Sequence, residues 1–351
     1  MYLSELSLFR QDRLHPLNDR PRFLIGIFKQ RNPLLWLALI LYAVVVKWVY
    51  LSSAQSLAST PSGGVLFRPI IHWLAGGEVQ SGSLRWLGLL FNLIQALQLN
   101  ALINRQKMMG APNFLPALSY LTISSFFPQW NDFSSWSLVL CIVLWVFSSQ
   151  FHLYQSPQSR GAVYNRCLVW GLLPLLEPAA MPFIVWGLMG IWVMRPFRWA
   201  EFWVILIGLI TPYYFLMIWN YWNGAADWYR VIPNLSFQLP QMEQPRWFFA
   251  GLALLAIPTL LGMLEVQSNL RKMLIPVRKG WTHWTIWLVL SISLPFLLPG
   301  SFGPGYTAIL IPTAAFQACF FYYAHLRIVP MLFFWIEFLA VMWIQYGDRF
   351  S

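Results

Sequence analysis

Charged residues are scarce in this 351-residue chain. Only 10% of its residues are Asp, Glu, Lys or Arg, whereas 58% are hydrophobic. A soluble domain has about 25% charged residues. So few charges cannot cover a water-exposed surface without leaving large apolar patches. The shortage excludes an ordinary soluble protein and indicates a surface that mostly faces lipid.

Cysteines are also few, and several known catalytic motifs are absent. The three cysteines, Cys141, Cys167 and Cys319, lie inside apolar runs without metal-ligand spacing, so neither a disulfide framework nor a metal site is predicted. The sequence has no phosphate-binding Gly-rich loop with Lys, no His-Glu-x-x-His pair and no Gly-x-Ser-x-Gly motif. ATP-driven transport and metalloprotease activity are therefore disfavoured, and no cofactor is identified.

What the chain does contain is a series of apolar runs separated by segments that are alternately basic. If each run is a helix, the fold is an all-α polytopic membrane bundle of about eleven spans, because lipid requires every backbone amide to be bonded internally. A cytoplasmic amino terminus and an external carboxyl terminus then place 17 of the 23 Lys and Arg residues on the cytoplasmic side. Five others (Arg68, Arg85, Arg230, Arg246 and Arg349) are external, and Lys47 lies within a span. Short basic loops are retained in the cytoplasm, so this distribution supports the topology.

The net charge of +11 fits the same topology. The excess basic residues face the anionic headgroups of the inner leaflet, so membrane lipids rather than nucleic acid are the expected partners. The predicted organisation has a basic amino-terminal segment (1–32), a transmembrane domain (33–346) and a short external tail (347–351). Large external loops are predicted at 52–83 and 222–246, and residues 65–74 are expected to form an amphipathic helix in the membrane interface.

The predicted spans follow the apolar runs. Residues 167–194 hold either two short spans or a re-entrant pair. The other spans are predicted at 33–51, 84–103, 114–127, 133–151, 202–221, 247–264, 281–298, 306–324 and 331–346. Polar residues within the second span are expected to face other helices or a wet cavity.

The first external loop holds three candidate site residues. Arg68 is suited to bind a lipid phosphate, His72 to titrate near neutral pH and Glu78 to act as a base. The alternative is that Arg68 and His72 anchor the interfacial helix to headgroups while Glu78 lies in a Gly-rich turn.

Two further acids are candidates in different settings. Asp132 lies in an external turn, where it is either an active-site acid, with Glu177 in the next external turn as a partner, or the amino-terminal cap of the following helix. Glu337 lies midway along the last apolar run, where a charge costs about 3 kcal/mol. It is either a functional intramembrane charge or a protonated side chain bonded to another helix. Lys47 is close enough to an interface to snorkel.

The second large external loop holds a cluster of acidic, aromatic and basic residues, from Asp227 to Arg230. Stacking and hydrogen bonding to a sugar would suit Asp227 and Arg230 with the Trp and Tyr between them. Anchoring at the membrane interface would suit them equally.

The order of these features resembles the GT-C superfamily of polytopic glycosyltransferases, which use polyprenyl-phosphate-linked sugars. The similar parts are a first span, an external loop with an interfacial helix, a second span that leads into Asn104–Gly110, and a turn that leads into a Pro-bearing span at Gly305–Pro312. The superfamily usually has an Asp in the first external loop, where this chain has Glu78. The chain also resembles uncharacterised polytopic proteins of bacterial membranes.

The resemblance implies an inner-membrane protein of bacterial cell-envelope assembly that handles a polyprenyl-phosphate-linked sugar at the outer face. In that case Arg68 and Arg230 would hold phosphate, and Glu78 or Asp132 would activate the acceptor. Two alternatives stay open: a non-enzymatic subunit that binds other subunits of an envelope or secretion complex, and a proton-coupled transporter that uses Glu337.

Overall fold

A computed structural model describes residues 24–30, 32, 34–52, 63–74, 81–154, 160–195, 198–224, 246–297, 304–326 and 328–346. Every regular element in these ranges is helical, and they contain no strand. The prediction of an all-α fold is therefore confirmed.

The helices occur in nearly the predicted order, with short 3-10 turns between some of them. The α-helices are α2 (Leu24–Phe28), α3 (Leu35–Val46), α4 (Trp48–Ser52), α5 (Phe67–Leu74), α6 (Ser81–Arg105), α7 (Leu115–Ser124), α8 (Ser135–Gln150), α9 (Arg160–Leu176), α10 (Pro182–Met194), α11 (Trp199–Trp222), α12 (Arg246–Asn269), α13 (Ile275–Leu297), α14 (Thr307–Tyr323) and α15 (Ile328–Tyr346).

Five of these helices are long and apolar enough to cross a membrane. They correspond to α6, α8, α11, α12 and α15, and four shorter apolar helices include α3, α7, α10 and α14. A span needs about 20 residues, or about 17 at the short end. The described part of the chain thus has the make-up of a helical membrane protein.

Three helices extend beyond the predicted apolar runs. Helix α9 begins at Arg160, α12 continues to Asn269, and α13 begins at Ile275 and so includes Arg278 and Lys279. The helices are longer than the predicted spans there, because hydropathy marks where a helix meets lipid and not where its backbone bonds end. Lys and Arg are good helix formers and can extend a helix beyond the hydrocarbon.

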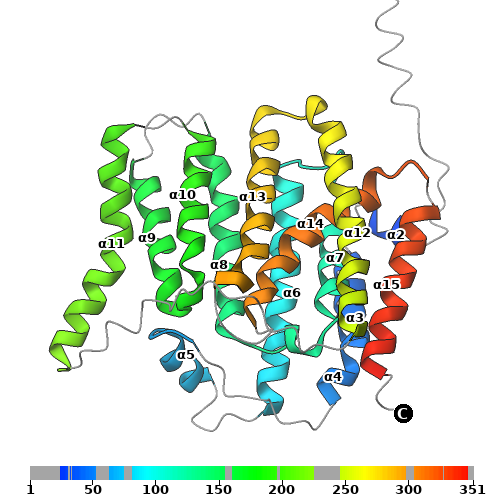
Figure 1. Ribbon diagram of the computed structural model, residues 1–351, viewed down its shortest axis with the longest axis horizontal. Coiled ribbons are helices and arrows are strands. Elements are labelled where there is room, and N and C mark those ends of the chain that lie inside the picture. The colour runs from blue at the N-terminus through cyan, green and yellow to red at the C-terminus, as the bar shows by residue number, and fades with distance from the viewer. Residues whose placement is uncertain are drawn as a thin grey trace, which may run out of the picture.

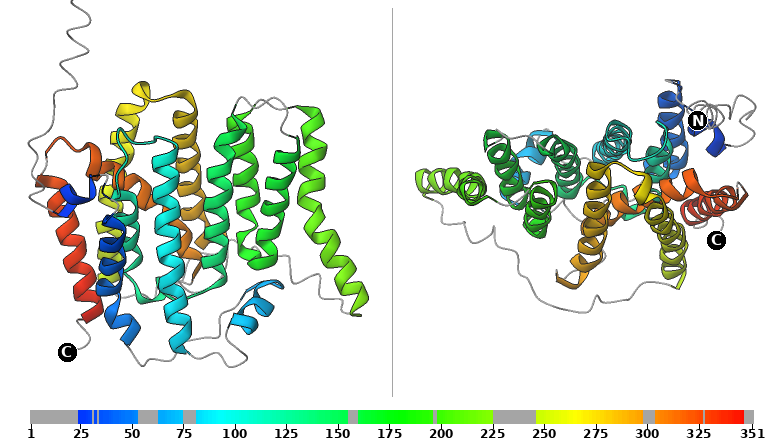
Figure 2. Two further views of the ribbon diagram at one scale, coloured as in Figure 1. Left: turned by 180° about the vertical axis from the view of Figure 1, so that it is seen from behind. Right: turned by 90° about the horizontal axis from the view of Figure 1, so that it is seen from above.

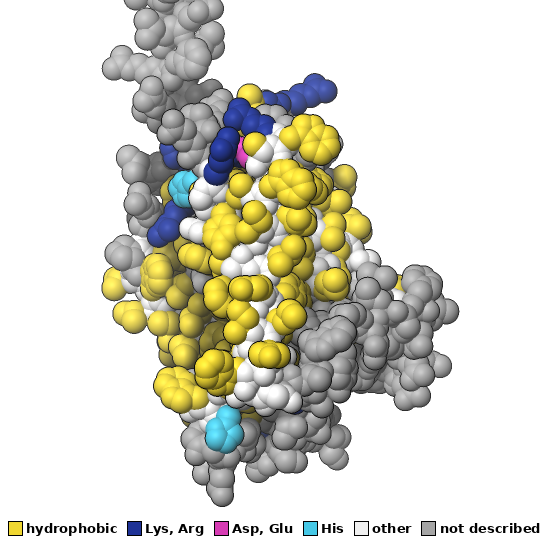
Figure 3. All heavy atoms as spheres, turned by 90° about the vertical axis from the view of Figure 1, so that its left-hand side faces the viewer, with side chains coloured by type: hydrophobic (Ala, Val, Ile, Leu, Met, Phe, Trp, Pro, Cys, Tyr) yellow, Lys and Arg dark blue, Asp and Glu magenta, His cyan; other side chains and the backbone are white. Residues whose placement is uncertain are grey.

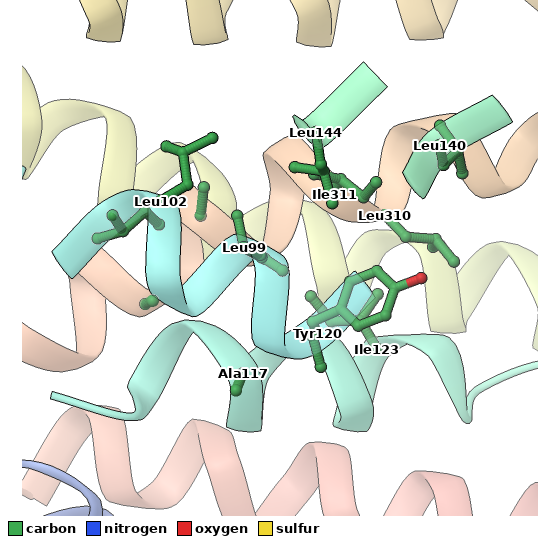
Figure 4. Packing of buried hydrophobic residues seen from close by; sticks show 14 of the residues in the cluster. Leu99, Leu102, Ala117, Tyr120, Ile123, Leu140, Leu144, Leu310 and Ile311 are labelled. Carbon is green, nitrogen blue, oxygen red and sulfur yellow. The ribbon is translucent and has the colours of Figure 1, made fainter. Parts of the chain in front are cut away.

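Helix α7 is enclosed by other helices of the bundle. All ten of its residues are buried, and it packs against α3, α6, α14 and α15. Figure 4 shows its Ala117, Tyr120 and Ile123 among leucine side chains of α6 and α8. At ten residues α7 spans about 15 Å, which suits a helix enclosed by protein better than one exposed to lipid.

Polar side chains on α6 face neighbouring helices, as the sequence predicted. Gln95 donates from Nε2 to the Ser137 carbonyl on α8 over 2.8 Å. The Tyr120 hydroxyl on α7 donates to Gln95 Oε1 and lies 3.4 Å from Asn92 Oδ1. These bonds fix α6 between α7 and α8.

Glycines allow two helix pairs to approach closely. A Cβ on Gly262 of α12 would lie 1.9 Å from the Phe316 carbonyl oxygen of α14, and one on Gly171 of α9 would lie 2.6 Å from the Leu209 carbonyl oxygen of α11. Small residues have this role in membrane helix packing. Helix α11 packs mainly on α9 at one edge of the bundle, with α15 at the opposite edge (Figures 1 and 2).

The helices alternate in direction, so the connections gather at two ends of the bundle (Figure 1). One end holds α5 and the turns after α7 and α9, and we call it the Asp132 end. The other end, here the basic end, carries most described Lys and Arg residues: Lys29, Arg105, Lys107, Arg160, Arg166, Arg195, Arg198, Arg271, Lys272, Arg278 and Lys279. Figure 3 shows Lys and Arg gathered above an apolar surface formed by side chains such as Trp203, Ile207 and Ile210 of α11.

Candidate functional site

Helix α5 lies across the Asp132 end of the bundle and is held there at two points. Its buried Phe67 packs with Leu84 of α6 and with Phe133. Before the helix, the Gly64 amide donates to the Leu176 carbonyl over 2.7 Å. A Cβ on Gly64 would lie 2.3 Å from the Leu175 carbonyl oxygen, so only glycine permits this approach to α9. The predicted helix at 65–74 is therefore confirmed, with bounds Phe67–Leu74.

The opposite face of α5 is open. Arg68, His72 and Trp73 are exposed, and Trp73 is 81% exposed. A short helix with one buried apolar face and a basic, aromatic outer face is suited to the headgroup layer. The structure thus places Arg68 and His72 where either predicted role, phosphate binding or anchoring, is sterically open to them.

Asp132 lies next to α5's docking site, in the turn between α7 and α8, and contacts two other segments. The Tyr50 hydroxyl of α4 donates to Asp132 Oδ1. The Arg85 guanidinium of α6 lies 5.5 Å from the centre of the Tyr50 ring, and its charge acts on Asp132. Gly88 brings α6 close to this turn, since a Cβ there would lie 2.1 Å from the Asn131 carbonyl oxygen. Asp132, Tyr50 and Arg85 form a group that we call the Asp132 triad.

The surroundings of Asp132 change its acidity. Burial raises the pKa of its carboxyl above the usual 3.8, while the Tyr50 hydrogen bond and the Arg85 charge oppose that rise. A carboxyl with a raised pKa holds its proton closer to neutral pH, as a general acid or base requires. The triad also joins a proton-exchanging carboxyl to a guanidinium that can pair with phosphate.

Glu177 occupies the neighbouring turn, between α9 and the 3-10 helix Pro178–Ala180. It caps that 3-10 helix by accepting from the Ala179 amide over 3.3 Å. The Ser135 hydroxyl donates to Glu177 Oε2 over 2.5 Å. Burial raises the pKa of the Glu177 carboxyl, against the lowering effect of these two hydrogen bonds.

The two external turns are therefore adjacent, because Ser135 is only three residues beyond Asp132. The hydrogen bonds of the described residues link Glu177 to Ser135 and Asp132 to Tyr50, not the two carboxyls to each other. The capping role considered for Asp132 is wrong: Ser134 caps α8, in a reciprocal capping box with Ser137. The Asp132 side chain therefore does not cap α8 and accepts the Tyr50 hydrogen bond instead.

The remaining predicted residues divide into those outside the described residues and those placed elsewhere in the bundle. Glu78, Asp227 and Arg230 lie outside the described residues. Glu337 lies midway along α15 and is completely buried, with Gln317 Nε2 of α14 at 2.5 Å from both of its carboxyl oxygens. Lys47 does not snorkel as predicted; it is 1% exposed and donates to Ser124 Oγ over 3.0 Å.

Sequence reasoning missed Tyr50 and Arg85. In the sequence Tyr50 is one of many aromatic residues at the end of an apolar run, and Arg85 is one of five external basic residues. Their relation to Asp132 depends on helix packing between segments far apart in the chain. The one available signal was that Arg85 lies inside the start of an apolar run rather than before it.

No group of three or more His, Cys, Asp or Glu residues able to hold a metal ion occurs among the described residues. We compared the chain with protein-family models, with curated proteins and with solved structures, and none of them matches.

Proposed function

We propose that this protein is a multi-pass protein of the bacterial cytoplasmic membrane, in cell-envelope assembly, that acts on a polyprenyl-phosphate-linked glycan at the outer face. The proposed topology has about eleven spans, with the basic end in the cytoplasm and the Asp132 end outside. The clustering of Lys and Arg at one end of the bundle supports this orientation, since short basic segments stay in the cytoplasm.

The observation that carries the proposal is the Asp132 triad beside α5. A polyprenyl-phosphate-linked sugar has its phosphate at headgroup depth and its sugar in water. A headgroup-level site for it needs a cation for phosphate and an acid–base group. Arg68 on the exposed face of α5 supplies the first, and Asp132 supplies the second.

In the proposed reaction, an acceptor hydroxyl attacks the anomeric carbon of the lipid-linked sugar. The bond between that carbon and the phosphate oxygen breaks, and the polyprenyl phosphate leaves with the bonding electrons. Asp132 takes the proton of the attacking hydroxyl, and Arg68 stabilises the charge on the leaving phosphate. Tyr50 keeps the Asp132 carboxylate oriented through its hydrogen bond.

Asp132→Asn tests the proposal. Asn retains the acceptor oxygen for Tyr50 but cannot take a proton, so glycan transfer should fall about 10²–10⁴-fold. The measurement is transfer from a lipid-linked sugar pool in membranes, scored with envelope glycans in cells at matched protein levels. Gln129→Ala, an exposed change in the same turn, is the control and should leave transfer unchanged. Normal glycans in Asp132→Asn cells would contradict catalysis and favour the non-enzymatic subunit.

A further inference from the structure

A column of polar side chains runs through the interior of the bundle, apart from the exposed face of α5. It lies where α3, α7, α14 and α15 meet. The Tyr42 hydroxyl of α3 hydrogen-bonds Thr122 Oγ1 of α7 over 2.8 Å, and Lys47 Nζ donates to Ser124 Oγ over 3.0 Å. Thr122, Ser124 and Lys47 are each at most 1% exposed.

Lys47 and Glu337, the residues in this region that can carry charge, are not in an ion pair. The one ion pair within the described ranges joins Arg195 Nη2 to Glu201 Oε1 over 3.1 Å, at the basic end. Lys47 and Glu337 are instead bonded to a hydroxyl and an amide. A lone charge in the interior of a membrane bundle is costly, whereas a neutral amine or carboxylic acid is much less so. Both groups are thus suited to gain and lose a proton.

The contact between Glu337 and Gln317 indicates a protonated carboxyl. Gln317 Nε2 lies 2.5 Å from both Glu337 oxygens, while the buried Gln317 Oε1 has no hydrogen-bond partner in the described structure. The two ends of a Gln amide are interchangeable by rotation. Rotation places Oε1 at these contacts, where a carboxylic acid can donate its O–H to it, whereas a carboxylate has no proton to donate.

The α3–α4 segment carries one tyrosine on the Glu337 side of this column and another at the Asp132 end. The Tyr42 ring centre lies 6.3 Å from that of Phe338, the residue after Glu337, and an ionised Glu337 carboxylate would be close enough to act on the Tyr42 hydroxyl. Tyr50 lies eight residues after Tyr42 on the nearly continuous α3–α4 segment, which corresponds to about 12 Å at 1.5 Å per residue. Its hydroxyl donates to Asp132. Lys47 lies between these two tyrosines on the same segment.

We propose that this column is a proton relay, in which Glu337 binds a proton inside the bundle and exchanges it with the Asp132 end. The proton released by Glu337 passes to the Tyr42 hydroxyl, which gives its own proton to Thr122. Ser124 and then Lys47 receive a proton in turn, with water between groups that are not in contact, and Tyr50 passes it to Asp132. Each hydroxyl accepts one proton and donates one, and Lys47 passes through its ammonium form, so the relay is balanced.

The other groups of the proposed relay come from three helices packed in the same bundle. Helix α3 contributes Tyr42 and Lys47, α7 contributes the hydroxyls of Thr122 and Ser124, and α14 contributes Gln317. Glu265 of α12 acts on Cys319 of α14, and the one described side chain that acts on the Glu337 carboxyl is Gln317. The relay needs neither a glycan nor catalysis by Asp132, so it goes beyond the proposed function.

Infrared spectroscopy of the full-length protein in lipid bilayers tests the relay. The carbonyl stretch of a protonated carboxyl should be present in the wild type and lost in Glu337→Gln, while Glu265→Gln should retain it. After transfer to heavy water, the shift of this band reports proton exchange at Glu337. Thr122→Val keeps the side-chain shape but removes the hydroxyl, so exchange should slow about tenfold, the equivalent of one hydrogen bond.

The matched control is Thr259→Val, a buried threonine of α12 whose hydroxyl bonds only its own helix, at the Leu255 carbonyl over 2.7 Å. Exchange in this variant should equal that in the wild type. If Thr122→Val does not fold, Tyr42→Phe removes the partner hydroxyl and should slow exchange in the same way. Absence of a Glu337-dependent band at every pH, or equal exchange rates in the Thr259 variant and the folded relay variant, would overturn the relay.

Discussion

Asp132 shows how one carboxyl depends on residues from two other helices. The Tyr50 hydroxyl and the Arg85 charge favour its ionised form, and burial outweighs them. The sequence identified Asp132 and Glu337 as candidates from their positions, one in an external turn and the other midway along an apolar run. It did not identify Tyr50 or Arg85, since tyrosines and external arginines are common and only packing selects one of each.

The raised pKa of Asp132 predicts how stability depends on pH. The folded state holds this proton more tightly than the unfolded state, so the contribution of Asp132 to stability is complete below pH 3.8 and is lost as pH rises through the folded-state pKa. We expect the unfolding temperature of the wild type in detergent to fall, relative to Asp132→Asn, as pH is raised through that window. A difference between the two proteins that does not change with pH would show that burial leaves this carboxyl unperturbed.

At the scale of helices, the apolar runs predicted where helices lie better than where they end. Helices α9, α12 and α13 continue past the runs into polar sequence. The sequence also gave no sign that α7 is enclosed on all sides, because an apolar run looks the same whether it faces lipid or protein. All ten residues of α7 are buried because the helices around it cover every side, and this depends on how those helices pack.

The close approach of α12 and α14 predicts a strong effect for one methyl group. Gly262→Ala would place Cβ 1.9 Å from the Phe316 carbonyl oxygen, which is backbone and cannot move aside. We expect a loss of about 1–3 kcal/mol of stability, as for other overpacked sites. The measurement is detergent-induced or thermal unfolding of both proteins. Gly82→Ala on α6, where nothing lies within 4 Å of the new Cβ, is the matched control and should be neutral or slightly stabilising.

At the scale of the whole molecule, the two ends of the bundle differ in charge and should lie on opposite sides of the membrane. Gln129→Cys places a thiol at the Asp132 end, and Lys107→Cys places one at the basic end; both positions are exposed. In intact cells a membrane-impermeant maleimide should label Cys at 129 and not at 107. Opening the inner membrane should add labelling at 107. Labelling at 107 alone in intact cells would reverse the proposed orientation.

The sequence by itself determined the class of this protein: scarce charge and long apolar runs leave helices in lipid as the one arrangement that bonds the backbone without water. It also determined that the basic segments alternate along the chain, so any antiparallel bundle brings them to one end. Only the tertiary structure decided which polar residues meet. Hydrogen bonds between Tyr50 and Asp132, or between Lys47 and Ser124, join residues more than 70 positions apart. Such contacts depend on helix rotation and tilt, and these are set by packing and not by composition.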